Sequence, residues 1–365
     1  MPPTAADANW IRTAASLALV LLASGADAGE RGTNDPLTAE IGRWSTFLRE
    51  TTSTDENWKD LKQSLDPAMA RTEAALSDGR RLLALERLAA TRMNLAGFAY
   101  VNSLSADERA DAAKLDSEWA RVGALLDATL AVPSRSSLEG VRPAAVRAEG
   151  EAALPQARNY YDSSLEYGRA TTPWSGFFYL GVAQAQSEFV SFCRTLSTPT
   201  ELSPPKVRSI AAELDALEGD LLRAYRPPAS IDRHSEFIGA SASLKEAREL
   251  DAAGLRYGAL LRYLQAAMRV YPLRPDAAAA DPAGLPKRLE AFEPRLLQGG
   301  VDHSIGRLYL ETAQANSSPG ANSAFAEAIA RDVLPRYFAA LGPAAPSPKK
   351  PAPSVSVTLV RWPYT

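Results

Sequence analysis

The chain has little of the chemistry on which most enzyme and metal sites depend: it contains one cysteine and two histidines among 365 residues, and 8% of its residues are aromatic. Because Cys193 has no second cysteine to pair with, disulfide bonds cannot hold this fold together. The apolar residues around Cys193 favour a buried, unreactive thiol. No cysteine and histidine cluster has metal-ligand spacing, and phosphate-binding loops, dinucleotide fingerprints and common hydrolase motifs are missing. We therefore expect no metal and no cofactor.

An excess of positive charge is also absent, since 40 lysines and arginines face 43 acidic residues and the net charge is −3. Binding to a nucleic-acid backbone is driven by many cationic contacts, so this balance disfavours nucleic acid as a partner.

Long apolar runs are absent too. The clearest one covers residues 14–23 and is interrupted only by Ser16, whereas a membrane-spanning helix needs about 20 apolar residues. Arg12 precedes this run, and the small-residue sequence Ala26-Asp27-Ala28 follows it. This order predicts a cleaved secretory signal peptide over 1–28 and a mature chain with no membrane span, located in the periplasm or outside the cell. An ordinary buried N-terminal helix is the alternative.

The body of the chain, residues 29–341, is predicted to be all-α. Alanine is its commonest residue and the strongest helix former, and apolar residues recur there at intervals of three and four. Short connections favour antiparallel helical hairpins, arranged as a bundle or as a short α-solenoid. The Pro- and Ser-containing segment 198–205 marks a possible sub-boundary. The clearest expected helices span 80–100, 105–130 with a capping box at Ser105 and Glu108, 206–225 and 243–271.

One segment, at about 302–338, carries the spacing of a known repeat. The segment contains a large-small pair (Ile305-Gly306), an aromatic residue (Tyr309), an Ala-Phe-Ala series (Ala321, Phe325 and Ala328) and a proline (Pro335). This pattern resembles the two-helix tetratricopeptide repeat, and the resemblance implies a helical protein-binding module. Ala96-Gly97 and Leu180-Gly181 echo the first half of the pattern. Glycines at these places let two helices approach closely.

The C-terminus differs from the body. Residues 342–354 are rich in proline, which predicts an extended spacer. Residues 355–365 alternate β-branched and polar side chains and end with Trp362 and Tyr364, which is a strand pattern. Two alternatives remain open. The tail docks on its own body or stays disordered, or it adds a strand to a protein partner or inserts its two aromatic rings into a partner's pocket.

Aromatic residues are concentrated in the middle of the chain. The candidate binding residues in this region are Tyr160, Tyr161, Tyr167, Arg169 and Trp174, because tyrosine, tryptophan and arginine make efficient contact sites and these five fall outside the predicted core face. Packing of a central helical hairpin explains the same cluster without a ligand.

The two histidines carry little signal for catalysis. In Asp302-His303-Ser304 we expect the flanking residues to cap a helix and His303 to be solvated, and His234 lies in another polar stretch. Arg262 and Arg269 repeat at a seven-residue interval beside tyrosines and are expected to be solvated as well.

Three functional hypotheses follow. The leading one is an exported soluble helical module that binds a protein partner or a ligand. The second is a helical hydrolase or lyase that uses carboxylates with tyrosine or arginine in an aromatic-lined groove. The third is a structural component of an envelope assembly, recognised through residues 355–365.

Overall fold

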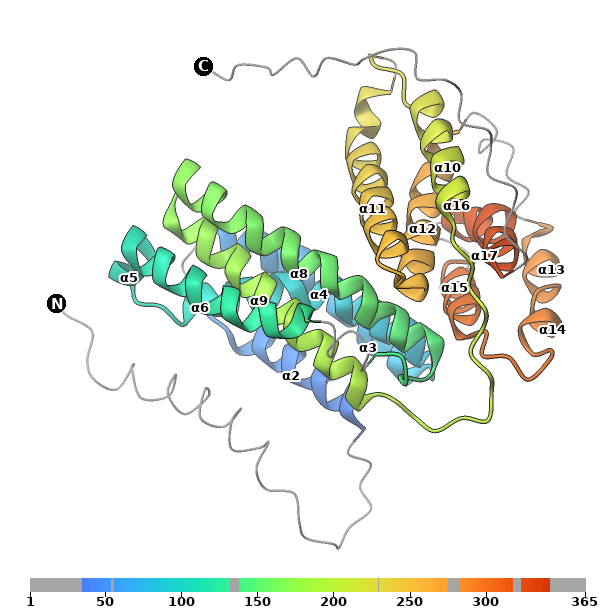
Figure 1. Cartoon of the computed structure of the whole chain (residues 1–365), viewed down its shortest axis with the longest axis horizontal. Coiled ribbons are helices and arrows are strands. Elements are labelled where there is room, and N and C mark those ends of the chain that lie inside the picture. The colour runs from blue at the N-terminus through green and yellow to red at the C-terminus, as the bar shows by residue number, and fades with distance from the viewer. Residues whose placement is uncertain are drawn as a thin grey trace, which may run out of the picture. The chain divides into compact units, whose positions relative to one another are not determined.

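The computed structural model describes residues 35–53, 56–131, 138–228, 230–274, 283–317 and 323–341. The predicted signal peptide, the Pro-rich linker and the β-like tail with Trp362 and Tyr364 lie outside these residues, so those expectations stay predictions. In the part described, the fold is all-α as expected, and no β-sheet forms there (Figure 1). None of the described helices combines the length and the apolar composition needed to cross a lipid bilayer.

The chain divides into two compact units. Unit 1 comprises residues 1–134 and 156–196, and unit 2 comprises residues 135–155 and 197–365. The long helix α8 (Ala144–Ala170) contributes its first part to unit 2 and its second part to unit 1. Pro155, inside this helix, is the last residue of the part that belongs to unit 2.

Unit 1 is built around a few closely packed helices. They are α2 (Pro36–Glu50), α3 (Glu56–Ser77), α4 (Arg81–Asn102), α5 (Ala106–Ala110), α6 (Ala112–Leu130), the second part of α8, and α9 (Pro173–Thr195). Helix α4 packs against α3 and α9, and α6 also packs against α9. Leu126, Phe177 and Leu180 are fully buried in the core of this unit, and Cys193 is buried as predicted.

The helix expected over 105–130 is two helices. The capping box is confirmed, since the Ser105 side chain accepts from the Glu108 N–H and the Glu108 side chain accepts from the Ser105 N–H. Asp111 then takes an extended conformation and caps α6 by accepting from the Ala113 N–H at 2.8 Å. The single-helix expectation was wrong because aspartate satisfies the backbone of a new helix start better than it continues an old one.

Two glycines let α4 and α9 approach closely, as expected. A Cβ added to Gly97 would lie 2.8 Å from the Phe178 ring. A Cβ added to Gly181 would collide with Tyr100 Cβ and lie 3.1 Å from the Ala96 carbonyl oxygen. The second contact is with backbone, which has little freedom to move away.

Gly181→Ala is therefore expected to lower the free energy of unfolding of unit 1 by about 2 kcal/mol through overpacking. Gly42→Ala is the matched control. Gly42 is exposed within α2 and an added Cβ would meet nothing within 4 Å, so alanine there should raise stability by up to about 1 kcal/mol. Urea denaturation of both variants measures the difference. Equal effects of the same sign would contradict the close packing of α4 and α9.

Unit 2 contains more and shorter helices. They are the first part of α8, α10 (Ala211–Ala224), η1 (Ile231–Arg233), α11 (His234–Ala252), α12 (Arg256–Val270), η2 (Tyr271–Leu273), α13 (Leu285–Glu290), α14 (Glu293–Leu296), α15 (Ser304–Ala315), α16 (Ser323–Ala328), the π-helical turn η4 (Ile329–Val333) and α17 (Leu334–Ala340). Helices α10, α11 and α12 pack side by side (Figure 1).

The long helix expected over 243–271 is interrupted. Helix α11 ends at Ala252, Gly254 has a φ of +77°, and α12 begins at Arg256. The Leu255 N–H donates to the Leu250 carbonyl at 2.9 Å, which closes the helix end in the manner of a Schellman motif. The apolar period continues across the break and conceals it, so the expectation of one helix was wrong.

The segment with the repeat-like spacing forms a packed helical pair. Helix α15 packs against α16, η4 and α17. Gly306, near the start of α15, faces Tyr337, near the end of the continuous helical run from α16 to α17, and an added Cβ would lie 2.7 Å from the Tyr337 ring. This contact makes the pair antiparallel, which is the packing expected of a helical repeat.

Candidate functional site

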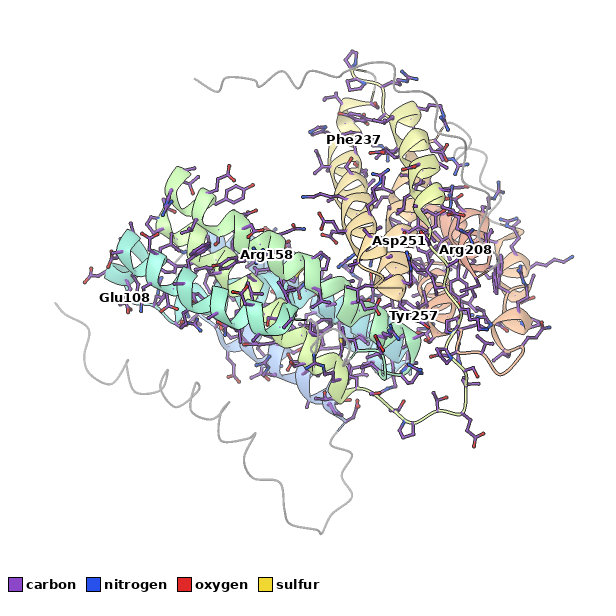
Figure 2. All side chains as sticks on the ribbon, in the orientation of Figure 1. Glu108, Arg158, Arg208, Phe237, Asp251 and Tyr257 are labelled. Carbon is purple, nitrogen blue, oxygen red and sulfur yellow. The ribbon has the colours of Figure 1, made fainter. Side chains whose placement is uncertain are left out.

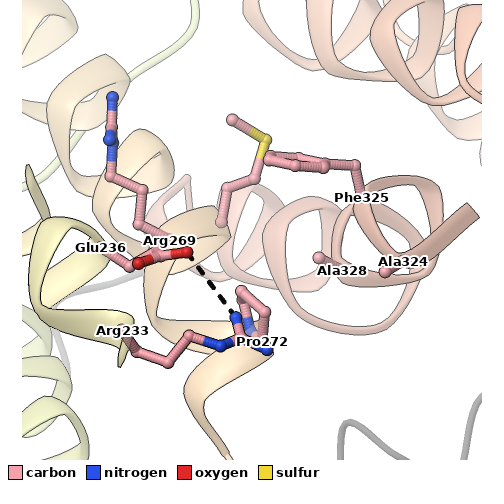
Figure 3. Close-up of a pocket in the computed structure, with 8 residues that line it drawn as sticks. Arg233, Glu236, Arg269, Pro272, Ala324, Phe325 and Ala328 are labelled. Atoms are coloured by element: carbon pink, nitrogen blue, oxygen red, sulfur yellow. Dashed lines mark ion pairs between the residues drawn. The ribbon is translucent and has the colours of Figure 1, made fainter. Parts of the chain in front are cut away.

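A pocket of about 380 Å³ opens in unit 2 (Figure 3). Its volume falls in the range of about 300–1,000 Å³ typical of small-molecule sites. Its lining comes from η1, α11, α12, η2 and α16. The lining residues are Arg233, Glu236, Met268, Arg269, Pro272, Ala324, Phe325 and Ala328.

The packing of α12 and α16 decides which side chains reach this pocket. Helix α12 buries Leu264, Ala267 and Val270 completely, which turns Met268 and Arg269 outward. Helix α16 buries Ala326 and Ala328, whereas Phe325 stays 38% exposed. A partly exposed phenylalanine beside a methionine gives the pocket an apolar wall.

Charged groups form the opposite side of the pocket. Arg233 Nη1 lies 3.7 Å from Glu236 Oε1, which is an ion pair without a tight hydrogen bond (Figure 3). The Ser235 hydroxyl donates to Glu236 Oε2 at 2.9 Å. This hydrogen bond, together with the nearby charges of Arg233 and Arg269, holds the pKa of Glu236 below its usual value. The carboxylate is therefore ionised at neutral pH.

The described lining residues of the pocket do not place a nucleophile beside a base. Glu236 is the one carboxylate among its described lining residues, and these include no histidine, cysteine, serine or tyrosine. A guanidinium group, a carboxylate and an apolar wall can orient a bound molecule. They do not supply a nucleophile with an adjacent base.

The structure brings most of the predicted aromatic candidates together in unit 1. Tyr179 of α9 stacks between Tyr160 and Tyr167 of α8, with ring centroids 5.8 Å and 4.7 Å apart. Trp174 stacks on Phe178 at 5.6 Å, and Phe178 meets Tyr179 edge to face. These rings mainly pack on one another, and among the tyrosines Tyr167 is the most exposed, at 46%. Tyr179 links the group.

Two candidates have other surroundings. Tyr161 is 6% exposed and stacks on Trp119 in the core of unit 1, so the expectation of a surface position was wrong for this residue. It is adjacent to Tyr160 in sequence, but its side chain points in a different direction from α8. Arg169 is exposed and pairs with Asp116 at 3.0 Å. Both members of that pair are solvated, so it contributes little to stability.

Both histidines bond to tyrosines. His303 Nδ1 lies 2.9 Å from the Tyr337 hydroxyl, and burial lowers the pKa of His303. His303 is thus a partly buried packing residue, and the expectation of a solvated side chain was wrong. His234 Nδ1 lies 2.8 Å from the Tyr225 hydroxyl at the exposed start of α11. No carboxylate orients either ring in the manner of a catalytic triad among the hydrogen bonds of the described residues.

Three buried carboxylates in unit 2 accept hydrogen bonds at or beside helix N-termini. Asp302 accepts from the Ser304 N–H of α15 and from the Ala144 N–H of α8. Glu151 accepts from the Gly258 N–H of α12 at 2.8 Å. Asp251 accepts from the Ile210 N–H at 3.3 Å, immediately before α10 (Figure 2). From the sequence alone, these three carboxylates could have been catalytic groups. In the structure they accept hydrogen bonds from backbone N–H groups at helix starts.

The arginines of α12 also differ from expectation. Tyr257 and Tyr263 are 8% and 1% exposed, and Arg262 is held by Glu246 at 2.9 Å. Of the arginines expected to be solvated on this helix, Arg269 is exposed, and it lines the pocket.

The sequence did not reveal the pocket, although three of its residues stood in segments that drew attention: Arg233 beside His234, Arg269 on its helix, and Phe325 in the repeat-like segment. Their convergence depends on the packing of α11, α12 and α16. Comparison with protein-family models, curated proteins and solved structures finds no match to this chain.

Proposed function

We propose that the chain is an exported helical binding protein whose unit 2 holds a small organic ligand in the pocket formed by α11, α12 and α16. The pocket itself carries the proposal, because it combines a ligand-sized volume with an apolar wall and a few polar groups. Export rests on the signal-peptide pattern of residues 1–28.

The location of the predicted groups favours binding over catalysis. The enzyme hypothesis requires two carboxylates that converge with Tyr160, Tyr161 or Arg169 in an aromatic-lined groove. The pocket is in unit 2 and contributes the single carboxylate Glu236, whereas those three residues belong to unit 1.

The resemblance to the tetratricopeptide repeat supports the same class of function. We propose that α15 to α17 form one degenerate repeat of this type. Phe325, a residue of the repeat-like pattern, is exposed to the pocket, so this helical pair contributes directly to ligand binding.

The full chain is expected to bind the fluorescent probe anilinonaphthalene sulfonate in this pocket. Ala324 is exposed at the pocket wall, so Ala324→Trp fills the space without disturbing the core and should weaken binding at least about tenfold, measured by fluorescence titration. Ala216→Trp places the same side chain at an exposed position of α10 outside the pocket and should leave the affinity unchanged. Equal affinities in both variants would show that the pocket is not a binding site.

A further inference from the structure

The pocket carries an excess of positive charge. Its described lining contains two guanidinium groups, those of Arg233 and Arg269, and one carboxylate, that of Glu236. The Arg233–Glu236 pair is long, and both side chains are more than a third exposed, so the two groups hold each other weakly. Arg269 forms no ion pair or hydrogen bond with any residue that the structure describes. One cation thus lacks a tight partner in this site.

Arg269 owes its position to a glycine. Its guanidinium group lies against Gly239 of α11, where an added Cβ would be 2.5 Å from Nη1. Any other residue at 239 would displace this guanidinium group from the surface of α11. The two cations come from different elements, with Arg233 at the end of η1 and Arg269 near the end of α12, and their guanidinium groups point in different directions in Figure 3.

The apolar wall faces these charges across the pocket. Figure 3 shows Phe325 on α16 opposite the Arg233–Glu236 pair. Met268 and Pro272 add further apolar surface to the pocket. A ligand that satisfies both sides needs an anionic group at one end and an apolar body at the other.

We propose that the ligand is an amphipathic organic anion, whose anionic group is bound by Arg269, the cation without a tight partner, and whose apolar body packs on Phe325 and Met268. This inference rests on the proposed function of the pocket and adds the chemical class of the ligand. Guanidinium groups bind carboxylates, sulfonates and phosphates through charge-assisted hydrogen bonds.

Two probes that differ by one charged group test the inference on the full chain. Anilinonaphthalene sulfonate is an anion, and phenylnaphthylamine has the same ring system without the sulfonate. The anion is expected to bind at least about tenfold more tightly, and raising the salt concentration should reduce this preference. Equal affinities for the two probes, with both lost in Ala324→Trp, would overturn the inference while leaving the proposed function intact.

Charge-removing variants locate the anionic group. Arg269→Gln is expected to weaken binding of the anionic probe by about tenfold and to leave the neutral probe unaffected, and Arg233→Gln should have a smaller effect because Arg233 already pairs with Glu236. Arg307→Gln is the matched control, because Arg307 is an exposed arginine of α15 outside the pocket. An equal effect of Arg307→Gln would show that general surface charge, rather than the pocket, attracts the anion.

The natural anion can come from free solution or from a lipid surface. Displacement of the probe by decanoate, without sedimentation of the protein on phosphatidylglycerol vesicles, would assign a free amphiphile. Sedimentation that is lost in Ala324→Trp would assign a lipid headgroup. Both results support an anion site. If neither decanoate nor phosphatidylglycerol vesicles displace the probe, the result would count against such a site.

Discussion

Arg92→Met is expected to lower the free energy of unfolding of unit 1 by about 3 kcal/mol, because it removes a buried cation that links three helices. The Arg92 side chain is 3% exposed. Its Nε donates to Glu40 Oε1 at 3.2 Å and its Nη1 donates to the Ala185 carbonyl oxygen at 2.5 Å. Methionine keeps most of the aliphatic volume, so the loss reports the polar contacts that join α2, α4 and α9.

The same carboxylate supplies the control. Arg43 also pairs with Glu40, at 2.6 Å, but its side chain is 52% exposed. Arg43→Met should therefore cost less than about 1 kcal/mol. Four of the six tryptophans of the chain, Trp44, Trp58, Trp119 and Trp174, are described residues of unit 1, so tryptophan fluorescence during urea denaturation reports mainly on this unit. Similar losses in the two variants would contradict the role of burial.

Asp302→Ala is expected to destabilise unit 2 by about 3 kcal/mol. Asp302 is 3% exposed and accepts from the Ala144 N–H at 2.5 Å and from the Ser304 N–H at 3.0 Å. It thus satisfies the first turns of α8 and α15, which start 160 residues apart. Alanine would leave both buried N–H groups without this acceptor and remove a negative charge from two helix N-termini.

Asp111→Ala provides the comparison, because Asp111 caps α6 alone and is exposed. Its loss should cost about 1 kcal/mol. Hydrogen exchange followed by mass spectrometry should show faster exchange at the starts of both α8 and α15 in Asp302→Ala. Unchanged protection at either start would show that the carboxylate does not stabilise both helices.

Local signals predicted much of the helical structure correctly. The capping box at Ser105 and the close-contact glycines Gly97 and Gly181 are confirmed. They could be predicted because a capping box involves residues within one helical turn, and because glycine has no side chain to hold a neighbouring helix away. The breaks at Asp111 and Gly254 were not predicted. At both residues the helical spacing of apolar side chains continues without interruption. This spacing is the same for one long helix and for two consecutive helices, so it does not reveal the break.

The candidate site was much harder to predict. The aromatic cluster near Tyr160 is real, but its rings pack chiefly on one another. Tyr160 and Tyr161 show why sequence proximity misleads, since adjacent residues on a helix point in different directions and only one of these two entered the core. The pocket residues were not grouped at all, because they come from segments that are far apart in the chain.

The sequence by itself determined that this protein is all-α, that its fold forms without disulfide bonds, and that two glycines accommodate a helix crossing. Those properties follow from composition, from the absence of a second cysteine and from side-chain size. Only the tertiary structure decided which carboxylates cap helices and which arginine lines a pocket. Asp302 meets Ala144, and Arg269 meets Gly239, only after distant helices have packed, and sequence spacing contains no measure of that proximity.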